Sequence, residues 1–247
     1  MEYVLITGGT SGIGYELARV FAQNGFGILI AASNSEKLSM AKNSLSEEFH
    51  TEVETYKKDL SKFGAAEELY KEITGGHSEI SVLVNNAGYG LKGETQNIGI
   101  EEDRNMLILN MMTLAELTKL FLKDRYQKGS GKVLNVSSTG AFQPGPYTSS
   151  YFASKAFVLS YSRAVRYEAA KHGIQVCTLC PGATKTGFFQ REGAKIPKGA
   201  MNPENVARHA YHSLMKNKSI FIPGWRNKLL CLLPSVIKMK FVAKMKQ

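Results

Sequence analysis

Short apolar runs alternate along this chain with longer segments in which apolar residues recur at the spacing of an amphipathic helix. The pattern predicts strands at residues 3–7, 27–32, 52–57, 81–85, 132–137, 174–179 and 219–222. Helices are predicted at residues 12–24, 35–48, 64–74, 101–127, 151–171 and 206–216. Alternation of this kind predicts an α/β fold: a doubly wound, parallel, seven-stranded sheet of the Rossmann type with helices on both faces.

The chain is long enough for one large domain with a sizeable core, since 43% of its 247 residues are hydrophobic. No proline-rich or serine-rich linker divides it, and no repeat of roughly 20–50 residues recurs. We therefore expect a single domain over residues 1–224 and a distinct tail at residues 225–247. Residues 184–205 form the one long segment without clear periodicity, which is typical of a lid.

Positive charge is concentrated near the C-terminal end. The chain carries a net charge of +10, and nine Lys and Arg residues follow its last acidic residue, Glu204, so residues 1–204 carry only about +1. The tail mixes cations with leucines around Pro234, and its apolar runs are too short for a spanning helix. It can lie on an anionic membrane surface, or pack on its own domain or on a partner subunit. Nucleic-acid binding is not expected, because aromatic residues are sparse and no reading helix is evident.

The cysteines and the start of the chain indicate the compartment. Cys177 and Cys180 have CxxC spacing, but no second pair completes a zinc site, and both lie in an apolar run. They are interpreted as core residues, and no metal site is predicted. The sequence begins directly with an apolar strand, without the pattern of a signal peptide. We therefore expect a protein of the reducing cytoplasm, which the tail can bring to a membrane surface.

The first predicted strand runs into a glycine-rich loop at residues 7–14, where a helix begins. Glycines let the backbone approach a phosphate closely, and the helix N-terminus presents free N–H groups. The GxxxGxG spacing differs from the commoner GxGxxG fingerprint, and an ordinary glycine-rich turn is the alternative. The loop residues expected to hold a dinucleotide are Gly8, Thr10, Ser11, Gly12, Ile13 and Gly14.

The end of the second predicted strand carries no carboxylate, which would bind a ribose 2′-hydroxyl and favour NAD. Ser33 and Asn34 stand there instead and can hydrogen-bond a 2′-phosphate, with Lys37 near them. The sequence therefore favours NADP over NAD, although no arginine is present to grip the phosphate. After the third strand, Asp59 and Leu60 are placed beside the adenine, with Asp59 accepting a bond from the amino group. A role for Asp59 in the loop or as a helix cap is the alternative.

Tyr151 and Lys155 are four residues apart and therefore share one face of a predicted helix. An ammonium near a phenol favours the phenolate, and a phenol with a lowered pKa is a good general acid or base for an alcohol or a carbonyl. The pair alone is a weak signal, because many helices carry it on a solvated face. Ser138, thirteen positions before Tyr151, ends the preceding strand and is expected to face the same site, where Ser137 or Thr139 can assist.

Five ordered motifs resemble the short-chain dehydrogenase/reductase family over roughly residues 3–224. They are the 7–14 loop, Asn85-Asn86-Ala87-Gly88, Asn110 with Ser138, Tyr151-x-x-x-Lys155 and Pro181-Gly182. The NAAGYG segment and the basic, leucine-rich C-terminus are similar to the bacterial oxidoreductases named after the D-alanine-transfer operon protein. The resemblance implies an NAD(P)-dependent oxidoreductase that transfers a hydride between the cofactor and a carbonyl/alcohol substrate. A nucleotide-binding sensor or scaffold of the same fold is the alternative, against which the intact set of catalytic residues argues.

The resemblance also implies a role for each matched residue. Tyr151 is implied as the general acid/base, Lys155 as the group that lowers its pKa and holds the nicotinamide ribose, and Ser138 as the hydrogen-bond partner of the substrate oxygen. Asn110 is implied to hold a water that links Lys155 to solvent. The other implied cofactor contacts are Asn86, Ala87 and Gly88 on the adenosine side, and Pro181, Gly182, Thr184 and Thr186 at the nicotinamide.

Side chains on the substrate side favour two different substrates. Phe188 and Phe189 can cover an apolar molecule, and an apolar ketone or alcohol is preferred. Three basic side chains of the same segment can attract an anionic molecule instead: Arg191, Lys195 and Lys198. Leu91 and the 142–147 loop are expected to line the same pocket. The two long predicted helices, 101–127 and 151–171, are candidate faces for a homodimer or homotetramer.

Overall fold

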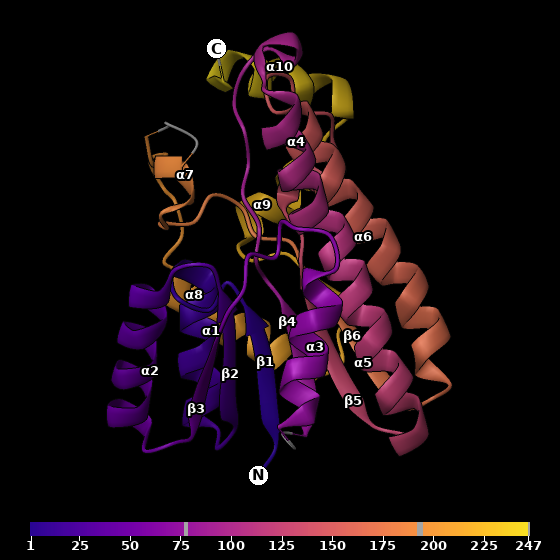
Figure 1. The fold of residues 1–247 in the computed structure, drawn as a ribbon. Helices are drawn as coiled ribbons and strands as arrows, with labels where there is room; N and C mark the ends of the chain where they lie inside the picture. Colours follow the sequence, from indigo (N-terminus) through magenta and orange to yellow (C-terminus); the bar gives the residue numbers. More distant parts are fainter. Residues whose placement is uncertain (77–78, 192–194, 247) are drawn as a thin grey trace.

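The computed structural model describes residues 1–76, 79–191 and 195–246, and it confirms the predicted fold. Seven parallel strands form one sheet in the order β3-β2-β1-β4-β5-β6-β7 (Figure 1). The strands are β1 (Tyr3–Thr7), β2 (Gly27–Ala32), β3 (Val53–Lys57), β4 (Ile80–Asn85), β5 (Gly131–Val136), β6 (Ile174–Leu179) and β7 (Ile220–Phe221). The chain builds outward from β1 to β3 and then crosses back to β4, so the strand order reverses between β1 and β4. Ligands of doubly wound sheets bind at this reversal, beyond the carboxyl ends of the strands.

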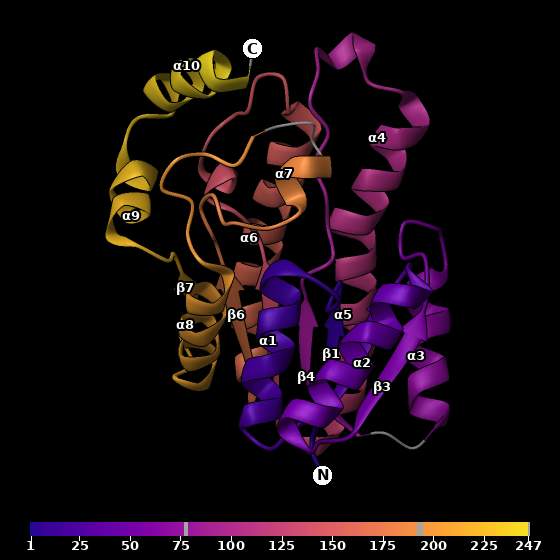
Figure 2. The same ribbon diagram turned by 90° about the vertical axis from the view of Figure 1, so that its left-hand side faces the viewer.

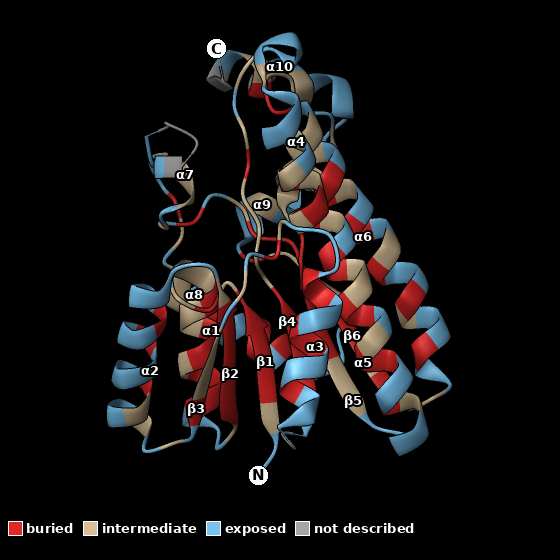
Figure 3. Ribbon diagram, viewed as in Figure 1, coloured by how far each residue is buried: buried red, intermediate tan, exposed pale blue. Residues whose placement is uncertain are grey.

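Two helical layers cover the sheet, each over its own apolar cluster. One layer contains α1 (Gly12–Gln23), α2 (Ser35–Phe49) and α8 (Pro203–Met215). The other contains α3 (Ala65–Gly75), α5 (Leu114–Lys128) and α6 (Ser149–Ala170). Figure 3 shows the buried residues on the strands and on the helix faces that meet them. Because the core strands are buried on both faces, they are almost continuously apolar, which is the pattern from which they were predicted.

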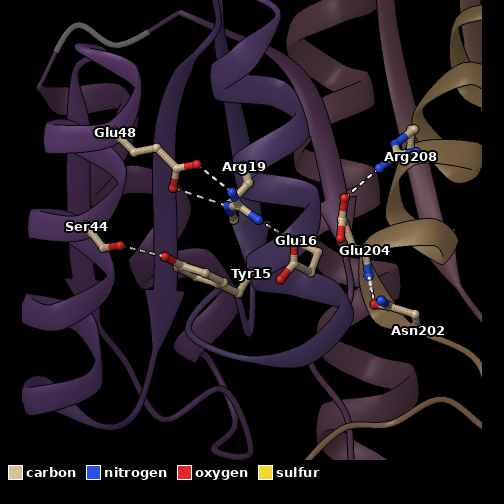
Figure 4. Close-up of polar contacts among 8 residues, drawn as sticks. All are labelled: Tyr15, Glu16, Arg19, Ser44, Glu48, Asn202, Glu204 and Arg208. Atoms are coloured by element: carbon tan, nitrogen blue, oxygen red, sulfur yellow. Dashed lines mark hydrogen bonds and ion pairs between the residues drawn. The ribbon is translucent and has the colours of Figure 1, made fainter.

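Polar contacts fix the helices of the first layer (Figure 4). Arg19 of α1 bridges Glu16 of its own helix and Glu48 of α2. At the start of α8, the Asn202 side chain accepts a hydrogen bond from the backbone N–H of Glu204 at 3.0 Å, which is the usual bond of a helix cap. The helix therefore begins three residues earlier than predicted, and the irregular segment before it is correspondingly shorter.

The segment predicted as one helix at 101–127 has three parts: α4 (Ile100–Leu107), the π-helical turn η2 (Ile108–Thr113) and α5. A π turn inserts an extra residue into the hydrogen-bond ladder and is frequent at functional sites. Residues 100–128 are long and apolar enough to cross a membrane by composition, but half of the most apolar window is buried, as in the core helix of an α/β domain. The other predicted helices and strands agree with the structure to within three residues.

The irregular segment and the tail both lie above the carboxyl ends of the strands (Figure 2). The segment contains the short helix α7 (Phe188–Arg191), and a bridge between Thr184 and Met201 closes its base. The tail forms α9 (Trp225–Leu232) and α10 (Ser235–Lys246), which Pro234 separates as predicted. Lys238 and Val242 of α10 are buried against the rest of the chain. The tail thus packs on its own domain, one of the alternatives that the sequence left open.

The two cysteines of the CxxC pair belong to the core, as predicted. Cys177 and Cys180 are free thiols that are at most 1% exposed. Burial raises the pKa of each to about 12, which disfavours the thiolate that metal binding and redox chemistry need.

Candidate active site

The glycine-rich loop is shaped by close contact with the end of β4. Gly8 and Gly12 have positive φ angles of 67° and 56°, which glycine adopts without strain. The Asn86 amide donates to the backbone oxygens of Thr7 and Gly8 at 3.0 and 3.2 Å. A Cβ on Gly14 would lie 2.4 Å from both the Asn86 amide nitrogen and the Gly8 oxygen. The loop therefore closes only with glycine at these positions, and the Asn86 amide braces it.

A cavity of about 1110 Å³ opens over the carboxyl ends of the strands. It is larger than the roughly 300–1,000 Å³ typical of a small-molecule pocket. Of the predicted site residues, it is lined by Gly8, Thr10, Ser11, Gly12, Ile13, Ser33, Asn34, Asp59, Leu60, Asn86, Ala87, Gly88, Ser138, Tyr151, Lys155, Pro181, Gly182, Thr184 and Thr186. Gly14 and Asn110 lie buried behind this lining. The structure therefore brings motifs from the whole length of the chain to one site.

Tyr151 and Lys155 lie on α6 at the wall of the cavity. The Lys155 ammonium nitrogen is 5.9 Å from the centroid of the Tyr151 ring and donates to the Val136 backbone oxygen at 3.0 Å. Lys155 is only 5% exposed. Burial lowers the pKa of Lys155 to about 8, because the charged form is poorly solvated there. An anionic partner in this site would favour the ammonium form again.

The two serines after β5 point to different neighbours. The Ser137 hydroxyl donates to the Lys155 backbone oxygen at 2.7 Å and so fastens β5 to α6. Ser138 lines the cavity and caps the short 3-10 helix η3 (Thr139–Phe142), where its hydroxyl accepts from the Gly140 N–H at 3.0 Å. Ser138 keeps its own hydroxyl proton for another acceptor, which agrees with the choice of Ser138 over Ser137.

Asn110 lies in the π turn and is 1% exposed. Its amide donates to the Tyr89 oxygen at 3.0 Å and to the Ser154 hydroxyl at 3.1 Å, and its carbonyl accepts from the Tyr89 N–H at 3.2 Å. A Cβ on Gly88 would lie 2.8 Å from the Asn110 oxygen and 3.3 Å from the Lys155 nitrogen. Asn110 and Lys155 thus converge on one point. The proton relay through Asn110 stays a prediction.

The adenosine end of the cavity follows β2 and β3. The Asn34 carbonyl caps α2 by accepting from the Lys37 N–H at 2.8 Å. Asp59 accepts from the Ser61 hydroxyl at 2.6 Å and from its N–H at 3.1 Å, and these bonds lower the pKa of Asp59. The loop role of Asp59 is therefore present, and its carboxylate still lines the cavity. Lys58 also lines this end beside Lys37, although the sequence had not singled it out.

The start of the irregular segment folds back over the glycine-rich loop. The Thr184 hydroxyl donates to the Gly182 oxygen at 3.0 Å, which turns the chain after β6. The Thr186 side chain lies 2.8 Å from where a Cβ on Gly12 would be. Thr186 therefore packs against the loop, and Pro181, Gly182, Thr184 and Thr186 line the same cavity. Their contacts with the nicotinamide stay a prediction.

Aromatic and tail residues form the remaining wall. The Phe188 ring of α7 lies 5.3 Å from the Tyr151 ring, and the Phe152 ring lies 5.9 Å from it. Four side chains of the tail line the same cavity and were missed: Asn227, Leu230, Lys238 and Val242. Nothing local marks these positions, because their approach depends on how α9 and α10 pack on η3.

Several predicted lining residues lie elsewhere. Leu91 and most of the 142–147 loop do not line the cavity. Gln143 of that loop lines it as predicted, and Lys92 lines it in place of Leu91. Phe189 and Lys195 line it as predicted, and Lys198 does not. The side chain of Arg191 lies outside the described part of the structure.

The residues fit a nicotinamide dinucleotide. The glycine-rich loop and the first turn of α1 offer backbone N–H groups to a pyrophosphate. Lys37 and Lys58 stand at one end of the cavity, and Tyr151 with Lys155 at the other. The fold and this site together define a dinucleotide-dependent oxidoreductase.

Comparison with known proteins gives the family. The family model described as short chain dehydrogenase matches residues 2–197. Very-long-chain 3-oxoacyl-CoA reductase of Mus musculus is 28% identical over 242 residues, which cover 91% of this chain and 76% of that protein. Hydroxysteroid dehydrogenase-like protein 1 of Gallus gallus is 32% identical, over 92% of this chain and 70% of that protein. The solved short-chain dehydrogenase from Sphingobium yanoikuyae in complex with NADPH is 26% identical, with a TM-score of 0.87 over 95% of this chain and 97% of that chain.

This chain belongs to the short-chain dehydrogenase family. It is an NAD(P)-dependent oxidoreductase that acts on ketone or alcohol substrates. The enzymatic function implied by the motifs is confirmed, in preference to a sensor or scaffold of the same fold.

Proposed function

We propose that the enzyme reduces an apolar ketone with NADPH, and oxidises the corresponding alcohol in reverse. The observation that carries this proposal is the convergence of Ser138, Tyr151 and Lys155 at one end of a cavity whose other end holds the phosphate loop and two lysines. A panel of ketones and alcohols, followed by nicotinamide absorbance with both cofactors, tests it. The proposal fails if no ketone or alcohol in the panel is turned over.

The side chains divide the work on the substrate oxygen. Ser138 donates its hydroxyl proton to the carbonyl oxygen, which polarises the bond and stabilises charge that develops there. Tyr151 gives the oxygen its proton, and the buried Lys155 ammonium stabilises the phenolate that remains. Asn110, behind Lys155, is the proposed path by which a proton returns from solvent. The bound cofactor supplies or accepts the hydride at the carbonyl carbon.

The preference for NADP is proposed from the adenosine end of the cavity. Ser33 and Asn34 directly follow the end of β2, where a carboxylate would repel a 2′-phosphate. Lys37 and Lys58 line the cavity beside them and can bind the phosphate. The NADPH complex of the Sphingobium yanoikuyae relative supports the same cofactor.

Lys37→Met is expected to weaken NADPH binding about tenfold and to leave NADH binding unchanged, because a charge-assisted hydrogen bond to the 2′-phosphate is lost. Titration of the enzyme with each cofactor measures both constants. Lys42→Met is the matched control, since Lys42 is an exposed lysine of the same helix that does not line the cavity. Wild-type protein that binds NADH as tightly as NADPH would contradict the cofactor assignment.

The substrate is proposed to carry an apolar body. Phe152, Phe188 and Phe189 surround the end of the cavity at which Tyr151 lies, and the tail adds Leu230. The relatives named as 3-oxoacyl-CoA and hydroxysteroid enzymes support a substrate of this kind. The NAAGYG segment and the basic tail support a narrower relationship to the D-alanine-transfer-operon-type oxidoreductases, which we keep as a proposal.

A homodimer or homotetramer is proposed through the long helices. Phe157 and Tyr167 of α6 are 38% and 87% exposed, so this helix presents large side chains on its outer face. Covering them in a subunit interface would remove apolar surface from water. Light scattering of the full chain tests the oligomeric state.

A cytoplasmic location is proposed, together with peripheral contact with an anionic membrane through the outer face of the tail. Exposed apolar residues gather on α9 and the start of α10: Trp225, Leu229, Leu232, Leu233, Val236 and Ile237. Arg226, Lys228, Lys240 and Lys244 accompany them, and the tail has no acidic residue. A second copy of the same face would bring like charges together, whereas anionic lipids complement them.

Leu232→Glu is expected to reduce co-sedimentation with vesicles that contain phosphatidylglycerol by about tenfold, because it removes apolar contact and adds a negative charge. Leu232 is 81% exposed, so the fold tolerates the change. Met40→Glu on α2, also an exposed apolar position, is the control and leaves binding unchanged. If wild-type protein does not co-sediment with anionic vesicles and Leu232→Glu dissociates an oligomer, the outer face of the tail is a subunit interface.

A further inference from the structure

Lys238 is a buried cation that the proposed hydride transfer does not use. It lies on α10, 3% exposed, and lines the cavity. Its ammonium donates to the Phe142 oxygen at 2.9 Å and to the Cys231 oxygen at 3.2 Å. An ammonium has three N–H groups, and both of its acceptors in the described part of the structure are neutral backbone carbonyls. A buried charge without an anionic partner is costly, so a residue needed only for packing would be apolar here.

The substrate end of the cavity carries positive charge that no lining carboxylate balances. Lys92, Lys195 and Lys238 line the cavity in addition to Lys37, Lys58 and Lys155. Among the described residues that line the cavity, Asp59 is the one acidic side chain, and it stands after β3 at the adenosine end. Lys37 and Lys58 line the adenosine end, where Lys58 also pairs with Glu68 and Glu72 at 3.4 Å. Among the described residues that line the cavity, no carboxylate therefore stands beside Lys238, which lies next to η3.

A polar group without a partner lies next to the Lys238 contact. The Gln143 side-chain oxygen is buried, and no hydrogen-bond partner for it exists within the described part of the structure. Gln143 lines the cavity and directly follows Phe142, whose backbone oxygen Lys238 binds. Buried polar groups are nearly always hydrogen-bonded. Rotation of the Gln143 side-chain amide by 180° would place its N–H2 at this position, where it can donate to an anionic oxygen next to Lys238.

The position of this pair relative to the reacting carbonyl follows from η3. Ser138 caps the start of this short helix, and Phe142 ends it. Four residues of 3-10 helix span roughly 8 Å. A group bound at Lys238 is therefore separated from the carbonyl at Ser138 by several bonds, with Phe152 and Leu230 along the same wall.

We propose that Lys238 and Gln143 form a substrate-binding subsite for an anionic oxygen group, a carboxylate or a phosphate. The substrate is then amphiphilic: a ketone on an apolar body, with its anionic group several bonds away at the tail. This proposal rests on the proposed ketone reduction and names its substrate class. It reconciles the apolar and anionic substrates that Phe188 and Lys195 favoured separately in the sequence.

The test compares ketones that differ only in charge. A series of methyl ketones of increasing chain length is prepared as the terminal carboxylate, its methyl ester and the terminal phosphate. Lys238→Met is expected to raise KM for the preferred anionic form about tenfold to a hundredfold, with kcat nearly unchanged and the ester unaffected. Whether the carboxylate or the phosphate shows the larger effect identifies the anionic group.

Two further variants separate charge from packing. Lys238→Gln keeps N–H donors for the Phe142 and Cys231 oxygens, and it is expected to lose the preference for the anion while retaining activity on the ester. Lys240→Met, an exposed lysine two residues along the same helix, should change neither. If Lys238→Gln lowers activity on anion and ester equally, or changes neither, Lys238 only fastens the tail and the proposal is overturned.

Direct binding distinguishes failure of the subsite from failure of the proposed reaction. Calorimetric titration of the NADPH complex with the carboxylate and the ester measures the subsite without turnover. Tighter binding of the carboxylate that disappears in Lys238→Gln supports the subsite even if no ketone is reduced. Equal binding of carboxylate, phosphate and ester overturns the subsite, whether or not ketones are reduced.

Discussion

Tyr151→Phe is expected to lower kcat/KM for ketone reduction by about a thousandfold while leaving the Kd for NADPH within about twofold. The substitution removes only the hydroxyl that gives its proton to the substrate oxygen. The ring keeps its contacts with Phe152 and Phe188, whose centroids lie 5.9 and 5.3 Å away. Steady-state kinetics with NADPH, together with a cofactor titration, measure the two quantities separately.

Tyr161→Phe is the matched control for this prediction. Tyr161 lies on the same helix, and its hydroxyl donates to the Ala115 backbone oxygen at 3.3 Å, away from the cavity lining. Its loss should leave kcat/KM almost unchanged. The assigned role of Tyr151 is wrong if the Tyr151→Phe enzyme keeps most of its turnover, or if both variants lose activity alike.

The fold was predictable because its strands are buried on both faces and its helices on one. Two kinds of pattern depend on local sequence alone. They are the continuous apolar runs of β1 and β2 and the 3.6-residue periodicity of α1 between them. Once the sheet is parallel, topology brings the carboxyl ends together. The glycine-rich loop, Ser138 and the Tyr151–Lys155 pair therefore had to meet, and the cavity contains all of them.

The π turn at η2 was not predictable from periodicity. Residues 101–127 have the pattern of one helix, and a single extra residue per turn does not change it visibly. The turn is supported by contacts from distant segments: Thr113 donates to the Leu60 oxygen at 2.7 Å, and Asn110 binds Tyr89. Such contacts exist only in the folded chain, so the sequence placed Asn110 correctly on the helix but not its local backbone.

The residues missed at the site were missed for a related reason. Lys58 was visible beside Asp59, yet only the folded end of β3 shows that it lines the cavity with Lys37. Lys238 lies in a tail for which the sequence left open a membrane surface, its own domain or a partner subunit as the contact. Its burial follows from hydrogen bonds to the Phe142 and Cys231 oxygens, which no spacing along the chain predicts. One face of the tail thus completes the substrate pocket. The exposed apolar residues of α9 and the start of α10 remain available for contact with a membrane surface.

Lys155→Met is expected to lower kcat/KM by a hundredfold or more, because it removes the cation that stabilises the Tyr151 phenolate. Loss of one preorganised charge-stabilising group typically lowers the rate by about this factor.

The same change should alter how the free energy of unfolding depends on pH. Burial lowers the pKa of Lys155 from 10.5 to about 8 in the folded apo protein. Between these values the unfolded chain binds a proton that the folded chain has lost. The wild-type free energy of unfolding therefore gains from this group as pH rises from 8 to 10.5, and the penalty is constant below pH 8.

The expected result is a difference curve between wild-type protein and Lys155→Met. The variant leaves the Val136 oxygen without its hydrogen-bond donor, and this cost in free energy of unfolding does not depend on pH. It therefore offsets the difference curve by a constant and leaves its slope unchanged. From pH 8 to 10.5, wild-type protein should gain about 3 kcal/mol relative to the variant, at about 1.4 kcal/mol per pH unit. Denaturant unfolding without cofactor at half-unit steps of pH measures this. Lys171→Met, an exposed lysine at the end of the same helix, should give a flat difference curve. A flat curve for Lys155→Met as well would show that Lys155 remains charged in the folded apo protein throughout this range, with an anionic neighbour compensating for its burial.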